Sequence, residues 1–79
     1  MPKYFFDVHN GHEHHIDMAG TELPDQHAAR DEATRAIAEI AADSIPGDGP
    51  QRDIAIHIRD RFGEPLLELT LKFKIRPAV

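Results

Sequence analysis

One segment, Asp25–Ile45, repeats its apolar residues with helical spacing, and this limits what the rest of the chain can form. Small or apolar side chains recur there at steps of three and four residues, which places them on one stripe of an α-helix. The stripe comprises Ala29, Ala33, Ala36, Ile37, Ile40, Ala41 and Ser44. Asp25 can cap the helix, whereas Pro46 cannot continue it. Because most of the stripe is alanine, we expect the helix to lie close against a sheet.

The flanking segments have the alternation of β-strands. Lys3–His9 is rich in aromatic and β-branched residues, and the Asn10-Gly11 turn signal separates it from a weaker return strand, His14–Met18. After the helix, Arg52–Asp60 and Leu66–Ile75 alternate cleanly, with their isoleucines and most of their leucines on one face. We therefore predict an α+β fold of order β-β-α-β-β. Its four-stranded antiparallel sheet has the order 2-1-3-4, with the helix on one face and the last strand at an edge.

The register of the first hairpin has two solutions. A two-residue Asn-Gly turn would pair His9 with His12, whereas a loop one residue longer pairs Phe6 with Ile16 and gathers apolar side chains on one face. A slip of one residue moves every side chain to the other face, so burial usually decides the register. We choose the longer loop.

The second hairpin turns at Asp60–Gly63, where Asp and Gly occupy the first and fourth positions of a type I turn. The tightest register that keeps the apolar residues together pairs Ile56 with Leu67. It also places Arg59 opposite Glu64, as an ion pair at the surface.

Size and composition exclude several classes of protein. A chain of 79 residues supports one domain, which we assign to residues 1–79. Its net charge of −5 argues against a general nucleic-acid binder, because phosphate contacts need a basic face. It has no cysteine, no apolar run that resembles a signal peptide, and no segment that could span a bilayer. We therefore expect a cytoplasmic protein without membrane contact.

Four motifs occur together over nearly the whole chain. They are Y-F-F-D-V at Tyr4–Val8, G-T-E-L-P-D at Gly20–Asp25, A-A-R-D-E-A-x-R-A-I-A-E-I-A at Ala28–Ala41, and D-x-x-G-x-P-L-L at Asp60–Leu67. In combination they resemble a family of small uncharacterised domains found mostly in rhizobia and related alphaproteobacteria. The resemblance implies a bacterial, intracellular, stand-alone domain. It implies no activity and no functional residues, because the family has none assigned.

The histidine-rich stretch His12–His15 departs from that family, whose members tend to have apolar residues near the positions of His14 and His15. Together with His9, it supplies the one group of potential metal ligands in the sequence: His9, His12, His14 and His15. Imidazole is a good ligand for zinc or nickel, and alternation places two of these side chains on one side of their strand. The more ordinary interpretation is a hydrophilic turn. His57 is read as a lone histidine on the outer sheet face.

No catalytic constellation is recognisable. Ser44 and Thr34 have no histidine at a fixed spacing, and there is no thiol. We expect neither an enzyme nor a cofactor, apart from the zinc or nickel of the histidine alternative.

The face of the sheet without a helix is the predicted interaction face. Its residues are Phe5, His57, Leu66, Thr70 and Lys72. Exposed Phe5 and Leu66 would offer apolar area to a partner. The long edge strand also invites pairing with another strand. Lys72 and Lys74 would either guard against such pairing or meet acids such as Glu68 across a two-fold axis.

The leading hypothesis is therefore a protein-interaction or self-associating module, a homo-oligomer or the partner of another protein. A metal-binding histidine hairpin is the alternative. A nucleic-acid-associated or antitoxin-like module comes third, because Pro24-Asp25 and Glu32-Ala33 are similar to residues of a small β-β-α-β antitoxin domain.

Overall fold

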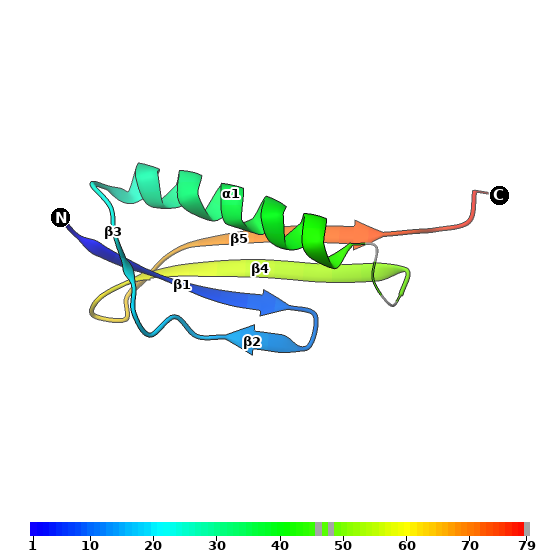
Figure 1. Cartoon of the computed structure of the whole chain (residues 1–79), viewed down its shortest axis with the longest axis horizontal. Helices are drawn as coiled ribbons and strands as arrows, with labels where there is room; N and C mark the ends of the chain where they lie inside the picture. Colours follow the sequence, from blue (N-terminus) through cyan, green and yellow to red (C-terminus); the bar gives the residue numbers. More distant parts are fainter. Residues whose placement is uncertain (46, 48, 79) are drawn as a thin grey trace.

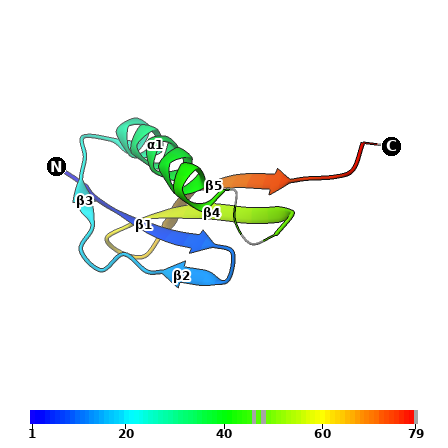
Figure 2. The same ribbon diagram turned by 45° about the vertical axis from the view of Figure 1, so that its right-hand side comes forward.

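A computed structural model describes residues 1–45, 47 and 49–78. The elements in chain order are β1 (Lys3–Asn10), β2 (Glu13–His15), β3 (Thr21–Glu22), α1 (Gln26–Ser44), β4 (Gln51–Asp60) and β5 (Pro65–Lys74). The antiparallel strands are ordered β2-β1-β4-β5, and β3 also pairs with β1. The helix lies over one face of this sheet (Figures 1 and 2). The predicted α+β fold and strand order are confirmed, and β3 adds a short fifth strand where we expected only a connection.

The helix begins and ends close to the predicted residues. The Asp25 side chain accepts a hydrogen bond from the Ala28 N–H at 2.9 Å, as an N-cap does. At the other end, the Ile45 N–H donates to the Ala41 carbonyl at 2.8 Å. The predicted stop at Pro46, and Asp48 in the following loop, lie outside the described residues.

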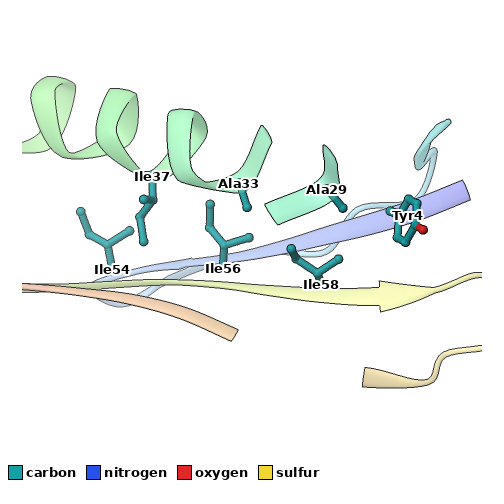
Figure 3. Packing of buried hydrophobic residues seen from close by; sticks show 7 residues of the cluster. All are labelled: Tyr4, Ala29, Ala33, Ile37, Ile54, Ile56 and Ile58. Carbon is teal, nitrogen blue, oxygen red and sulfur yellow. The ribbon is translucent and has the colours of Figure 1, made fainter. Parts of the chain in front are cut away.

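The core is the layer between α1 and the middle of the sheet (Figure 3). The three isoleucines of β4 point toward the helix and are at most 1% exposed, and Ala29 and Ala33 facing them are fully buried. The fully buried side chains of greatest volume are Ile54, Ile56 and Ile58. Small residues on the helix thus face large ones on the strand, as expected of a helix that packs closely on a sheet.

The first hairpin has neither of the two registers considered. His9 pairs with His14 around a loop of two residues, Gly11-His12, and the ladder ends with Val8 opposite His15. Gly11 has a φ of +63° and His12 does not have a positive φ, which is the pattern of a type II′ turn. The glycine thus takes the first central position of the turn, rather than the second as predicted.

The predicted pairing of Phe6 with Ile16 is therefore wrong, as is the return strand to Met18. The Phe6 N–H donates to the Asp17 carboxylate at 3.1 Å instead of to the backbone of a return strand. Ile16 is 52% exposed and Met18 is 87% exposed. Here hydrogen bonds to a carboxylate, and not apolar clustering, set the path of the chain.

The second hairpin has the predicted turn but a shifted register. The Gly63 N–H donates to the Asp60 carbonyl at 3.1 Å, which confirms the reversal. Ile56 pairs with Leu69 instead of Leu67. One residue of this shift arises at the turn, where Arg59 lies opposite Pro65, and the other comes from a β-bulge that inserts one extra residue, Leu66, into β5. The total shift is two residues, so the side chains from Leu67 to Lys74 stay on their predicted faces. The predicted pairing of Arg59 with Glu64 is wrong, since Arg59 lies opposite Pro65.

Candidate functional site

Asp7 and Arg59 form a half-buried ion pair on the outer face, which is the face of the sheet that α1 leaves uncovered. The Nε of Arg59 lies 2.8 Å from Asp7 Oδ2, and its Nη2 donates to the backbone carbonyl of Asp17 at 2.9 Å. The Asp17 N–H donates in turn to Asp7 Oδ1 at 3.0 Å. These bonds tie the segment after β2 to β1 and β4.

The Asp17 carboxylate accepts three backbone hydrogen bonds. Its Oδ2 accepts from Phe6, and its Oδ1 accepts from Ala19 and Gly20 at 3.0 Å each. Burial raises the pKa of the Asp17 carboxyl, but these hydrogen bonds outweigh it, so that the pKa lies below its ordinary value. The pKa of Asp7 is lowered in the same way: burial raises it, and the hydrogen bonds from Arg59 and from the Asp17 N–H, together with the positive charge of Arg59, outweigh that effect. Carboxylates whose oxygens accept several hydrogen bonds, as these two do, stabilise the local backbone conformation.

Sequence reasoning missed this network. Alternation along the two strands puts Asp7 and Arg59 on the outer face, but their contact depends on β1 lying beside β4. In that pairing Asp7 is opposite His57, and Arg59 is one diagonal step away. The one sequence signal for the ion pair was the presence of opposite charges on the same face of the sheet.

The network covers part of the predicted interaction face. The guanidinium of Arg59 lies 4.7 Å from the centroid of the Phe5 ring, and a Cβ on Gly20 would lie only 2.9 Å from Phe5 Cε2. Phe5 is therefore half-buried, and Leu66 is half-buried against the core. The expectation that these two side chains are exposed is wrong. The other three members differ among themselves: His57 is half-buried, while Thr70 and Lys72 are exposed.

Histidines from three neighbouring strands meet beside this network. The ring centroids of His9 and His14 are 4.2 Å apart, and those of His9 and His57 are 5.0 Å apart. The Nδ1 of His57 lies 3.4 Å from Glu68 Oε2. His9, His57 and Glu68 line a shallow groove of about 610 Å³.

The four histidines that the sequence suggested as ligands do not converge. His9 and His14 are neighbours, but His15 is opposite Val8 on the other side of the sheet, and His12 lies in the turn. His57 is the third member instead, brought in by the β1–β4 pairing. Over residues 1–45, 47 and 49–78, no three His, Cys, Asp or Glu side chains lie as they would around a metal ion.

β5 is a free edge of the sheet. The N–H of Ile75, directly after β5, donates to the Pro50 carbonyl at 2.6 Å, so Ile75 occupies a hydrogen-bonded position facing β4. Such positions recur at every second residue of an antiparallel ladder. From Leu67 to Phe73, the odd-numbered residues of β5 therefore bond to β4. The even-numbered ones direct their N–H and C=O outward: Glu68, Thr70, Lys72 and Lys74.

The opposite edge is more interrupted. β2 covers Val8–Asn10 and β3 covers Lys3–Tyr4, and the Asp17 network holds the chain between them. Short and broken edge strands are poor templates for a further strand. β5 is ten residues long and forms the far margin of the sheet (Figure 1). It is the edge that suits a partner strand.

A single helix on one face of an antiparallel sheet, with a long free edge, defines the chain as a small α+β domain. It belongs to the family described as Domain of unknown function (DUF6894), whose model matches residues 3–72. The match runs from β1 into β5, so the resemblance to a family of unknown function is confirmed. No curated protein and no solved structure was found to be similar. Among the described residues, no helix is long and apolar enough to cross a membrane.

Proposed function

We propose that the chain is a non-enzymatic, cytoplasmic bacterial module that works by association through its sheet. The observation that carries this proposal is the free edge of β5, which is ten residues long and regular from Leu67 onward. Addition of a strand to such an edge supplies main-chain hydrogen bonds as affinity and side-chain pairs as specificity. A domain of 79 residues has a small core and gains stability from any further surface that it buries.

Light scattering at micromolar concentration tests association, and Thr70→Pro tests the edge. The Thr70 amide points outward, so proline removes a hydrogen bond to a partner strand without removing one to β4. We expect a dimer of the natural chain and a folded monomer of Thr70→Pro. Thr70→Ser, which keeps the amide, is the matched control and should remain a dimer.

Two other results would contradict the proposal. A monomer at every concentration would remove self-association. A dimer that is indifferent to Thr70→Pro would move the interface from the β5 edge to the outer face around Phe5.

Metal binding is a second candidate, favoured by the approach of His9, His14 and His57. Glu68 lies beside the Nδ1 of His57, which leaves its Nε2 for a ligand, as in carboxylate–histidine metal sites. Rotation of side chains would have to bring the three nitrogens together, since they do not converge as they lie. The proposed ions are zinc and nickel.

Calorimetry with zinc at neutral pH tests the metal site. We expect the heat of binding to be lost in His9→Ala and His57→Ala and kept in the control His12→Ala. Loss of the heat in His12→Ala alone would place binding at the hairpin turn. Absence of heat in the natural chain would remove the metal candidate.

The antitoxin-like and nucleic-acid alternatives have less support. The Phe5 ring that could stack on a base lies beneath Arg59, and Arg59 is neutralised by Asp7.

A further inference from the structure

The free edge of β5 is complementary to itself in charge. Three successive outward-facing positions carry a negative, a neutral and a positive side chain: Glu68, Thr70 and Lys72. An antiparallel copy presents the same row in reverse, so each charge meets its opposite. We infer that the partner at this edge is a second copy of the chain, paired about a two-fold axis at Thr70. The inference rests on the proposed function and specifies its partner and register.

Alternation limits the registers of such a pair. The numbers of paired residues must sum to an even value, because only then do helix-side residues face helix-side residues. With an even sum, the even-numbered residues of the two edges also lie opposite one another, so their outward N–H and C=O groups can form hydrogen bonds. Odd sums would place Thr70 against a leucine and mismatch both faces.

Among the even registers, the one centred on Thr70 combines the longest overlap with matched charges. It aligns Leu66–Lys74 with itself and places Glu68 opposite Lys72 of the partner subunit, twice. A centre at Leu71 shortens the overlap and moves Glu68 opposite Lys74 of the partner subunit. A centre at Leu69 gives an equally long overlap but pairs no opposite charges, since Glu68 then lies opposite Thr70 of the partner subunit. Cross-strand pairs of opposite charge stabilise a sheet, and like charges directly opposite destabilise it.

The helix side of β5 supports the same register. Leu71 is 36% exposed, although alternation predicts it on the inner face. In the pair, Leu69 lies opposite Leu71 of the partner subunit, and Leu67 lies opposite Phe73 of the partner subunit. These are non-hydrogen-bonded positions, where side chains approach most closely. The partner therefore covers apolar side chains that one chain leaves open to water, and the two helices lie on the same face.

The two edge lysines then have different roles. Lys72 pairs with the partner's Glu68, whereas Lys74 lies across from the partner's Leu66, where its methylene stem can pack. A register centred on Lys72 would oppose two like charges. The charge of Lys72 therefore stabilises the register centred on Thr70 and disfavours the one centred on Lys72.

Single cysteines report the register directly, since the chain has none of its own. A residue on the two-fold axis meets its own copy at about 5.5 Å between Cα atoms, within disulfide range. We expect Thr70→Cys to form a covalent dimer on mild oxidation. Lys72→Cys is the control, because its copy lies about 13 Å away along the strand, and it should remain unlinked.

The outcomes separate the inference from the proposed function. If light scattering finds only monomers and neither variant cross-links, association itself fails. If scattering finds a dimer but Lys72→Cys cross-links or Thr70→Cys does not, association stands and the register is overturned.

Charge reversal tests the ion pairs without a covalent link. We expect Glu68→Lys and Lys72→Glu each to raise the dimer Kd about tenfold, because each replaces two attractive pairs by two repulsive ones. The double variant restores the pairs and should return to within about threefold of the natural Kd. Arg61→Glu, a charge reversal at an exposed residue of the turn outside the paired segment, is the control and should leave the Kd unchanged. Additive losses in the double variant would overturn the pairing of Glu68 with Lys72.

Discussion

A single carboxylate decides where the first hairpin ends. The Asp17 carboxylate accepts hydrogen bonds from the backbone N–H groups of Phe6 on β1 and of Ala19 and Gly20 in the following loop. A ladder that continued past His15 would have to give up these bonds, which involve a charged acceptor and are stronger than neutral ones. Ile16 consequently lies on the outer face and remains half-exposed.

Asp17→Asn should destabilise the domain by about 1–3 kcal/mol at pH 7, because an amide group would turn its NH₂ toward a backbone N–H that needs an acceptor. The pKa of Asp17 is lower in the folded chain than in the unfolded one. Its stabilisation is therefore present above the unfolded value of about 3.9 and is lost as the pH falls through the folded value. Urea unfolding at pH 7 and pH 3 should show the gap between variant and natural chain narrowing in acid. An equal gap at both pH values would contradict this account.

At the scale of an element, α1 acts as a lid whose small residues set its distance from the sheet. Ala29 and Ala33 are fully buried against β4, and Ile37 fills the space beyond them (Figure 3). The polar side chains of the helix pair along its exposed surface, as Arg35 does with Glu32 at 3.0 Å. The helix thus depends on the sheet for most of its stability.

Ile37→Asp should unfold the domain. Burying an unpaired carboxylate costs several kcal/mol, and a small domain has only about 5–10 kcal/mol in total. Ala38→Asp places the same charge at the next residue, which is exposed, and should remain folded with a loss of about 0.5 kcal/mol. Circular dichroism during thermal unfolding separates the two. A cooperative transition of Ile37→Asp near that of Ala38→Asp would show that Ile37 does not face the core.

The whole molecule is elongated, 51 × 21 × 19 Å, with one thin core layer and one long open edge. Such a shape buries little surface for its length. Association at β5 would extend the sheet across two chains and add to the buried apolar layer at the edge where the single chain has least of it.

Thermal stability should therefore depend on protein concentration. For a dimer that dissociates as it unfolds, we expect Tm to rise by about 5 °C for a hundredfold increase in concentration. Thr70→Pro should have a Tm independent of concentration. Scanning calorimetry at several concentrations measures both, and a natural chain with a constant Tm would contradict a dimer that is coupled to folding.

The sequence by itself determined the features that depend on periodicity. The helix over Asp25–Ile45 and the inward isoleucines of β4 follow from spacing within short segments, and they agree with the structure. Spacing also gave the correct faces of β5, but not its register, because a shift of two residues leaves every face unchanged.

Only the tertiary structure decided what depends on which strands are neighbours. The turn and the bulge at Leu66 determine the register of β5 on β4. The three backbone N–H groups that donate to Asp17 keep β2 from continuing past His15. The contact of His9 with His57 joins residues that lie far apart in the chain. A local pattern carries no information on such contacts, because their energy comes from hydrogen bonds and packing between segments that only folding brings together.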